Sequence, residues 1–168
     1  KVASRQRFAI QGQPNDVTTR TNDAFEWSEN GGIFFLDYDP PKGETALEPS
    51  ELIACLKGAV PELGPVELLW WASASSCIFK GLELVHGIRG QRLYFAVKDA
   101  ADIPRAGKAL VDRLWLAGLG RYEVSKSGQL LERTLIDGSV FQSCRLDFAG
   151  GAHCLLPLRQ ERGDPVLH

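Results

Sequence analysis

The feature that most constrains the fold is a short apolar run that ends in two aspartates. Residues 33–36 are Ile-Phe-Phe-Leu, and they are followed by Asp37, one tyrosine, Asp39, Pro40 and Pro41. A continuous apolar run of this length predicts a strand that is buried on both faces. Alternate residues of a strand point to the same side, so the two aspartates are expected together at its C-terminal end, about 6–7 Å apart at Cα. The prolines cannot continue a β-ladder and turn the chain away.

The paired carboxylates admit two interpretations. Two like charges this close repel each other unless a cation lies between them, and hard oxygen ligands suit Mg²⁺ or Mn²⁺. Taken alone, however, an Asp-x-Asp at a strand end is more often a solvated strand terminus that leads into a turn. The metal interpretation therefore depends on the residues that follow.

Length and composition predict an ordinary globular domain. The chain has 168 residues, of which 44% are hydrophobic and 24% charged, with a net charge of −2. We expect a single domain over residues 1–168, or one compact unit of two small lobes, with a sizeable core. The net charge gives no broad electrostatic signal for nucleic acid, so any such surface would be a local patch.

Cysteine spacing and hydropathy bear on the compartment. The four cysteines show no C-x-x-C spacing, which argues against a zinc knuckle. With no signal peptide and no apolar run of membrane-spanning length, we expect reduced thiols, a cytoplasmic protein and no membrane partner. The chain contains no methionine and ends in a polar, proline-containing segment, so we expect a fragment of a larger protein with further domains beyond His168.

The order of predicted elements indicates an α+β protein. The expected elements after the first strand begin with a helix that opens at Pro49 and is stopped by Gly58. They continue with strands over 66–71, 82–86 and 91–97, a helix over 104–116, and strands over 121–124, 130–137 and 145–148. A glycine-rich turn separates the strands at 82–86 and 91–97, which we interpret as neighbours. Asp102 is expected to cap the second helix. Strands that alternate with helices predict a sheet covered by helices.

Polar residues follow several of these predicted strands. Asp137 ends the strand over 130–137, and three carboxylates that converge from separate strands, Asp37, Asp39 and Asp137, form the usual cradle of two-metal phosphoryl chemistry. Such a site also needs cations or hydroxyls for the nucleotide phosphates, because hydroxyls and exposed N–H groups donate to anions. The candidates that share this property are Ser75, Ser76, Lys80, Arg92 and Lys126.

Four short segments, taken in order, resemble a known family. They are Leu36–Pro40, Ser73–Ser76, Gly90–Tyr94 and Leu131–Asp137. This succession is similar to the archaeo-eukaryotic primase superfamily, specifically to the PrimPol-type catalytic domains of phage and plasmid replication proteins, which are commonly joined to a helicase. The likeness covers roughly residues 30–160.

The resemblance implies a fold and an activity. The fold would be a two-lobe mixed α/β primase-polymerase core whose C-terminal lobe is related to the RNA-recognition motif. The activity would be template-directed nucleotidyl transfer, either primer synthesis or DNA extension, from nucleoside triphosphates on single-stranded DNA with Mg²⁺ or Mn²⁺. A helicase domain or subunit would be a further partner.

The resemblance also assigns roles to residues. Asp37 and Asp39 match the first metal motif, and Asp137 matches the third metal ligand, with Asp147 as its competitor. Ser75 and Ser76 fall at the phosphate-contacting turn.

The chain departs from the family at its second motif. The family usually carries a histidine where this chain has Arg92. An arginine can still hold a triphosphate bidentately, and His86 on the preceding predicted strand is an alternative.

Three functions stay open at this point. The first is a primase-polymerase that uses Asp37, Asp39 and Asp137 for its metals. The second is a catalytically degenerate domain that binds nucleic acid or a replication partner, which Arg92 favours. The third is a metal-dependent nuclease built on the same carboxylates.

Overall fold

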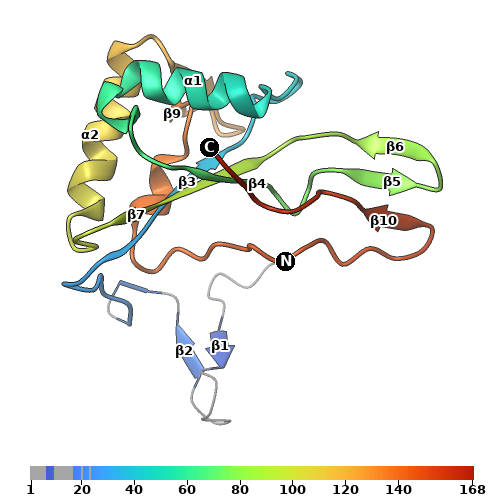
Figure 1. The fold of residues 1–168 in the computed structure, drawn as a ribbon, viewed down its shortest axis with the longest axis horizontal. Helices are drawn as coiled ribbons and strands as arrows, with labels where there is room; N and C mark the ends of the chain where they lie inside the picture. Colours follow the sequence, from blue (N-terminus) through green and yellow to red (C-terminus); the bar gives the residue numbers. More distant parts are fainter. Residues whose placement is uncertain (1–6, 10–16, 20, 23) are drawn as a thin grey trace.

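The computed structural model describes residues 7–9, 17–19, 21–22 and 24–168. A four-stranded antiparallel sheet lies at its centre, in the order β11-β4-β7-β3 (Figure 1). The sheet is built from β3 (Gly32–Tyr38), β4 (Leu69–Ala72), β7 (Gln91–Val97) and β11 (Val166–Leu167). Strands close in sequence are therefore not always neighbours, because β7 lies between β3 and β4.

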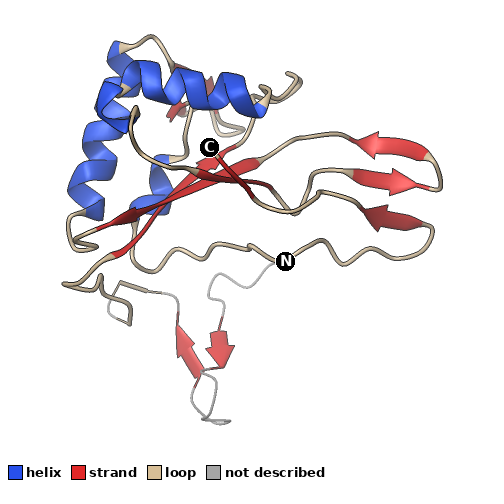
Figure 2. Ribbon diagram, in the orientation of Figure 1, coloured by secondary structure: helices blue, strands red, loops and turns tan. Residues whose placement is uncertain are grey.

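Two helices pack against one face of this sheet. They are α1 (Pro49–Ala59) and α2 (Ile103–Leu116), drawn in blue in Figure 2. Leu36 and Leu93 on the sheet, Leu52 on α1 and Leu114 on α2 are fully buried in the core between them. The fold is thus a mixed α/β protein with antiparallel sheets and two helices, as an α+β class requires.

Burial in β3 alternates, so the prediction of a strand buried on both faces is wrong. Phe34, Leu36 and Tyr38 face the helices and are buried. The side chain of Ile33 on the opposite face is 57% exposed, and that of Asp37 on the same face is half-buried. Helices cover only one face of the sheet, which leaves the second face, here called the open face, free to carry polar groups.

The ends of the helices differ in detail from the prediction. The N–H of Glu48 donates to Oε2 of Glu51 at 3.0 Å, which supports the start of α1. Gly58 lies inside α1 rather than ending it. The carboxylate of Asp102 does not cap α2, because it accepts two hydrogen bonds from Arg105.

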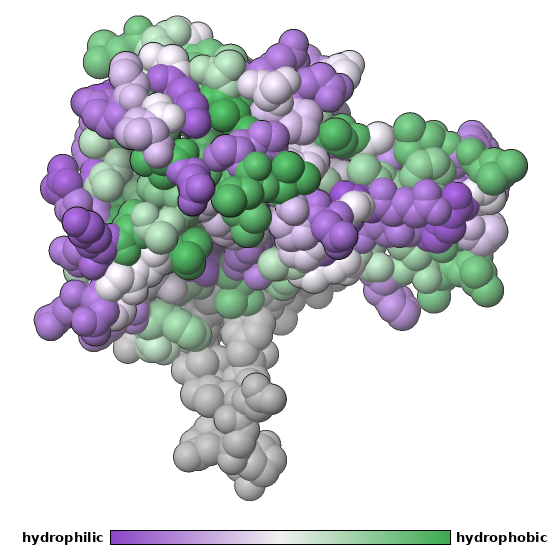
Figure 3. All heavy atoms as spheres, in the orientation of Figure 1, coloured by the Kyte–Doolittle hydropathy of each residue, from purple (hydrophilic) through white to green (hydrophobic). Residues whose placement is uncertain are grey.

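A second sheet projects from the body as an arm, which we define as β5 (Ile78–Lys80), β6 (Glu83–His86) and β10 (Leu158–Gln160), in the order β10-β5-β6. The expectation that β6 and β7 are neighbours is wrong: β6 pairs with β5, whereas β7 pairs with β3 and β4. The end of the arm carries apolar side chains that are almost fully exposed, Leu82 and Leu156 among them (Figure 3). The arm therefore adds little to the core.

Smaller elements complete the described chain. They are the antiparallel pairs β1 (Arg7–Ala9) with β2 (Val17–Thr19) and β8 (Gly120–Val124) with β9 (Leu130–Thr134), and the 3₁₀ turns η1 (Pro61–Leu63) and η2 (Gly138–Phe141). The strand expected over 145–148 is absent from this part of the chain, which crosses the sheet without entering a ladder.

Two further expectations concern thiols and membranes. The four cysteines, all within the described ranges, are free thiols: Cys55, Cys77, Cys144 and Cys154. Among the described residues, no helix has the length and apolar character needed to cross a bilayer.

Candidate functional site

Asp37 and Asp39 lie at the C-terminal end of β3 on the open face. Asp37 belongs to the strand and is half-buried, whereas Asp39 follows the strand and is exposed. The hydroxyl of Tyr38 points to the other side, where it accepts a hydrogen bond from the N–H of Leu47 at 3.0 Å. This bond anchors the loop that begins at the two prolines.

The backbone of the turn that precedes β7 approaches Asp39 closely. A Cβ atom at Gly90 would lie 2.6 Å from Oδ1 of Asp39 and 2.8 Å from Oγ of Ser73. A glycine at this position therefore makes room for the second carboxylate of the pair.

The third predicted carboxylate meets the first through the main chain. The N–H of Asp137 donates to the carbonyl oxygen of Asp37 at 2.9 Å. The strand expected to end at this aspartate in fact ends at Thr134, and Asp137 instead caps η2, with its carboxylate accepting from the N–H of Ser139 at 2.9 Å and from its Oγ at 2.8 Å. The structure thus brings Asp137 to the edge of β3 beside Asp37.

Asp147, the competitor of Asp137, lies over the open face. Its Oδ2 accepts from the hydroxyl of Tyr94 at 2.6 Å, and its Oδ1 is 3.1 Å from Nε of Arg92. Arg92 is the register partner of Asp37 across β3 and β7. Both candidate third carboxylates therefore approach Asp37, Asp137 from the strand edge and Asp147 from above the sheet.

The electrostatics of Asp37 reflect this crowding. Its pKa is raised from 3.8 to about 6, first because burial disfavours the charged form and then because the charge of Asp39 is close. Asp137 and Asp147 raise the pKa further, while Arg92 opposes them. A carboxylate whose charge is disfavoured by neighbouring carboxylates is one that a bound cation would stabilise.

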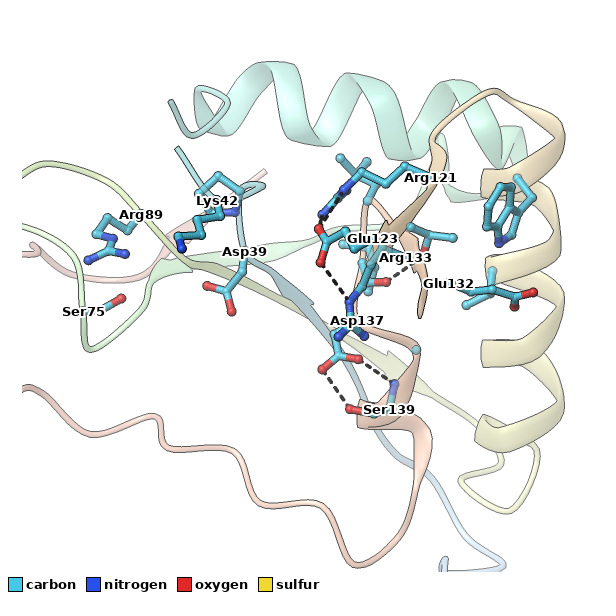
Figure 4. Close-up of a pocket in the computed structure, with 17 residues that line it drawn as sticks. Asp39, Lys42, Ser75, Arg89, Arg121, Glu123, Glu132, Arg133, Asp137 and Ser139 are labelled. Carbon is cyan, nitrogen blue, oxygen red and sulfur yellow. Dashed lines mark hydrogen bonds and ion pairs between the residues drawn. The ribbon is translucent and has the colours of Figure 1, made fainter. Parts of the chain in front are cut away.

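A cavity of about 750 Å³ opens beside these carboxylates (Figure 4). Asp39 and Asp137 lie on its wall, and two pairs of cations flank them, Lys42 with Arg89 and Arg121 with Arg133. The second pair is neutralised in part by Glu123, whose carboxylate is 2.8 Å from Arg121 and 3.5 Å from Arg133.

Lys42 and Arg89 are the cations without a carboxylate partner in this cavity. Among the described residues, neither forms an ion pair. Ser75, on the turn after β4, lies with them on the cavity wall and exposes its side chain. These three residues form a positive and hydroxyl-bearing side of the cavity opposite Asp137.

Only one of the residues predicted to contact phosphate lies on this wall, namely Ser75. Ser76 is fully buried, and its hydroxyl donates to the carbonyl oxygen of Gly90 at 3.0 Å and accepts from the N–H of Arg89 at 3.0 Å. Lys80 lies on β5 in the arm. The hydroxyl of Ser76 therefore stabilises the turn before β7 rather than facing the cavity, because it already binds the main chain of Gly90 and Arg89.

The remaining predicted cations also lie elsewhere. Arg92 is 8% exposed and held on the open face by Asp147, and Lys126 lies in the turn between β8 and β9. His86, the alternative to Arg92, is exposed on β6 and lines a second cavity of about 470 Å³ that shares Ser75 and Arg89 with the first.

Lys42 and Arg89 were not predicted as site residues from the sequence. Lys42 follows directly after the two prolines that turn the chain at the end of β3, and Arg89 lies in the glycine-rich turn before β7. A turn that follows or precedes a functional strand end is a place where a cation can reach the site, and this signal was present in both segments.

The donor set fits a divalent metal in its chemistry. No group of three or more His, Cys, Asp or Glu side chains in the described part of the chain is placed to hold a metal ion. Mg²⁺, however, is usually bound by one or two carboxylates together with substrate phosphates and water, rather than by a cage made of protein alone. Asp37 and Asp39 supply such a pair of hard oxygen ligands next to a cavity with a basic side.

Comparison with known proteins adds no assignment. No protein-family model matches the sequence, and neither a curated protein nor a solved structure matches it.

Proposed function

We propose that this chain is a nucleotidyltransferase that extends or initiates a DNA or RNA strand on a single-stranded DNA template. The observation that carries the proposal is that Asp39 and Asp137, which flank Asp37 at the end of β3, lie on the wall of a cavity whose other side presents Lys42, Arg89 and Ser75. Carboxylates on one side and unpaired cations on the other match a nucleoside triphosphate bound through its phosphates.

The topology supports the relation to the RNA-recognition fold. The succession β3, α1, β4, β7, α2 places the first strand beside the third and both helices on one face, as in that βαββαβ arrangement. Asp137 reaches the free edge of β3, where that fold has its fourth strand. The division of the core into two lobes stays a prediction.

The basic and the acidic residues of the site would have different roles. Lys42, Arg89 and the hydroxyl of Ser75 would hold the triphosphate and orient its α-phosphate toward the aspartates. Asp37 and Asp39, with Asp137 beside them as the candidate third ligand, would hold Mg²⁺ or Mn²⁺ together with the phosphates of the substrate. The ion would supply charge neutralisation at the reacting phosphate and would lower the pKa of the attacking 3′-hydroxyl. Because Asp37 must be ionised to bind a cation and its pKa is about 6, metal binding is expected to weaken below that pH.

A second candidate function, binding without catalysis, is favoured by the environment of Arg92. Arg92, which replaces the histidine of the family that the sequence resembles, is buried and tied to the protein itself. A domain that has lost its nucleotide contacts at this motif would bind nucleic acid or a replication partner, such as a helicase, without catalysis.

Primer extension tests the first candidate. The chain is incubated with a labelled primer on single-stranded DNA, nucleoside or deoxynucleoside triphosphates, and Mn²⁺. We expect product from the wild type and from Asp99→Asn, a control beyond the opposite end of β7, and a loss of about 100-fold or more in the Asp37→Asn/Asp39→Asn double variant. Equal product from the double variant would rule out these carboxylates.

Two further measurements separate the alternatives. Calorimetry with Mn²⁺ and dATP should show metal-dependent nucleotide binding, and its absence would favour the degenerate domain. Incubation of the labelled DNA with metal but without nucleotides should leave it intact, whereas degradation would indicate a nuclease.

A further inference from the structure

The segment over residues 143–149 crosses the open face of the sheet outside any ladder. It is held there by side chains that bind its main chain. Arg92 on β7 donates to the carbonyl oxygen of Phe148, and Arg162 donates to that of Ala149 at 2.7 Å. Arg162 is itself fixed, since its guanidinium lies 3.8 Å from the ring centroid of Trp71 on β4. Two buried or stacked arginines thus pin one short segment to the sheet.

Arg92 is the centre of this arrangement. Its register partners on both sides are Asp37 on β3 and Trp71 on β4, so its side chain emerges in the middle of the open face. Its side chain is 9% exposed, and its Nε lies 3.1 Å from Oδ1 of Asp147 without the alignment of a hydrogen bond. The hydroxyl of Tyr94 binds the other oxygen of that carboxylate. The guanidinium of Arg92 therefore binds the segment over residues 143–149, and Arg92 does not line the cavity that holds Lys42 and Arg89.

The same segment reaches the third carboxylate of the site. Arg145 donates to Oγ of Ser139 at 2.6 Å, and that Oγ in turn donates to Oδ2 of Asp137 at 2.8 Å. The guanidinium of Arg145 is also 3.9 Å from the carboxylate of Asp137. Arg92 thus holds the segment at residues 147–148, and Arg145 of the same segment connects it through Ser139 to the carboxylate of Asp137.

We propose that Arg92 is a positioning residue that clamps the segment 143–149 onto the open face and, through Arg145 and Ser139, fixes the carboxylate of Asp137. Its guanidinium binds the protein rather than the triphosphate. The catalytic consequence rests on the proposed function, whereas the clamp itself does not.

Two variants break the clamp from opposite sides. Arg92→Lys keeps the charge but loses the planar fork that reaches Asp147 and Phe148 together. Asp147→Asn removes the ionic partner from the partly exposed segment and leaves the core untouched, so it serves if the first variant fails to fold. Arg159→Lys is the matched control, because Arg159 also binds a main-chain carbonyl, that of Gly81, but in the arm.

Tryptic cleavage after Arg145 measures the clamp without any activity. In both clamp variants we expect the cleavage rate at this bond to rise about tenfold, since proteolysis follows the population of the open segment. The double variant should cleave no faster than Arg92→Lys alone, because that variant has already lost the contact with Asp147. An unchanged rate in both single variants would overturn the clamp.

Steady-state extension assays test the consequence. We expect kcat to fall about tenfold in both variants, the KM for nucleotide to change less than about twofold, and the control to match the wild type. A tenfold rise in KM with unchanged cleavage would show that Arg92 contacts the nucleotide. If the wild type makes no product, faster cleavage in the variants would sustain the clamp while the proposed function fails.

Discussion

The N–H of Asp137 donates a hydrogen bond to the carbonyl oxygen of Asp37 at 2.9 Å, which brings two aspartates from distant parts of the chain to one edge of the sheet. No regular strand pairs there over the described residues, because β9 already ends at Thr134. The bond places Asp137 beside Asp37 and Asp39 at the end of β3, where the proposed metal site would take a third ligand. Asp137 and Asp147 are thus two candidates for the third carboxylate of the site.

Asparagine variants distinguish the two candidate third carboxylates. In Asp137→Asn we expect the affinity for Mn²⁺, measured by calorimetry in the presence of a nonhydrolysable nucleotide, to fall about tenfold or more. The amide oxygen of asparagine can still accept from the N–H of Ser139, so the unfolding free energy should fall by no more than about 1 kcal/mol. A larger loss of Mn²⁺ affinity in Asp147→Asn than in Asp137→Asn would instead make Asp147 the third ligand.

Protonation of Asp37 should make stability depend on pH. Its pKa is 3.8 in an ordinary environment and about 6 in the folded chain, so between these values the folded state holds the proton more tightly. The contribution of this group to stability is thus present at low pH and is lost as pH rises through 6. Asp37→Asn has no proton to lose, and above pH 6 we expect it to exceed the wild type by about 1 kcal/mol, allowing for solvent screening of a half-exposed carboxyl.

Thermal unfolding between pH 4 and pH 8 checks this expectation. The difference in Tm between the variant and the wild type should grow up to about pH 6 and then level off. Saturating Mn²⁺ should stabilise the wild type at pH 8 and leave Asp37→Asn unchanged. A difference in Tm that stays constant with pH would mean that burial and neighbouring charge do not raise the pKa of Asp37 in the folded chain.

Cations on the cavity wall should control nucleotide affinity. We expect Lys42→Ala and Arg89→Ala each to raise the KM for nucleotide about tenfold, because each removes a charge-assisted hydrogen bond to phosphate. Lys80→Ala is the matched control, since Lys80 lies on β5 in the arm and does not line the cavity. The assignment of the cavity fails if the control raises KM as much as the two cavity variants.

Two helical glycines should respond to alanine in opposite ways. A Cβ at Gly107 in α2 would lie 2.3 Å from the ring of Phe141, so Gly107→Ala should lower the unfolding free energy by about 1–3 kcal/mol. A Cβ at Gly58 in α1 meets nothing within 4 Å, and Gly58→Ala should raise it by up to about 1 kcal/mol through helix propensity. Chemical denaturation of both variants provides the measurement, and stabilisation by Gly107→Ala would contradict the packing of α2 on η2.

Several elements could be predicted because local patterns specify them. The helix over 104–116 was expected from its apolar spacing and is observed as α2, one residue longer at its start. The strand over 91–97 is confirmed as β7, because a run of β-branched, aromatic and apolar residues is a local property of the chain. Its partner could not be predicted in this way: the turn at 87–90 suggested β6, and the structure pairs it with β3 and β4.

In the candidate site, too, only the features that depend on neighbouring residues could be predicted. The proximity of Asp37 and Asp39 follows from their spacing on one strand. Lys80 and Arg92 are basic residues in plausible positions along the chain, yet the first lies on the arm and the second is held by Asp147. Whether a cation faces a cavity depends on which sheet its strand joins and what covers it, and neither property is local.

The sequence by itself determined the alternation of strands and helices, the paired aspartates at the end of β3 and the turn that follows them, because these depend on neighbours within a few residues. Only the tertiary structure decided that helices cover one face of the sheet and leave Asp37 on the other. It also brought Asp137 to the edge of β3, and it separated Arg92 from the cavity while placing Lys42 and Arg89 there. The physical reason is that strand pairing and burial are set by contacts between segments far apart in the chain, which no local pattern encodes.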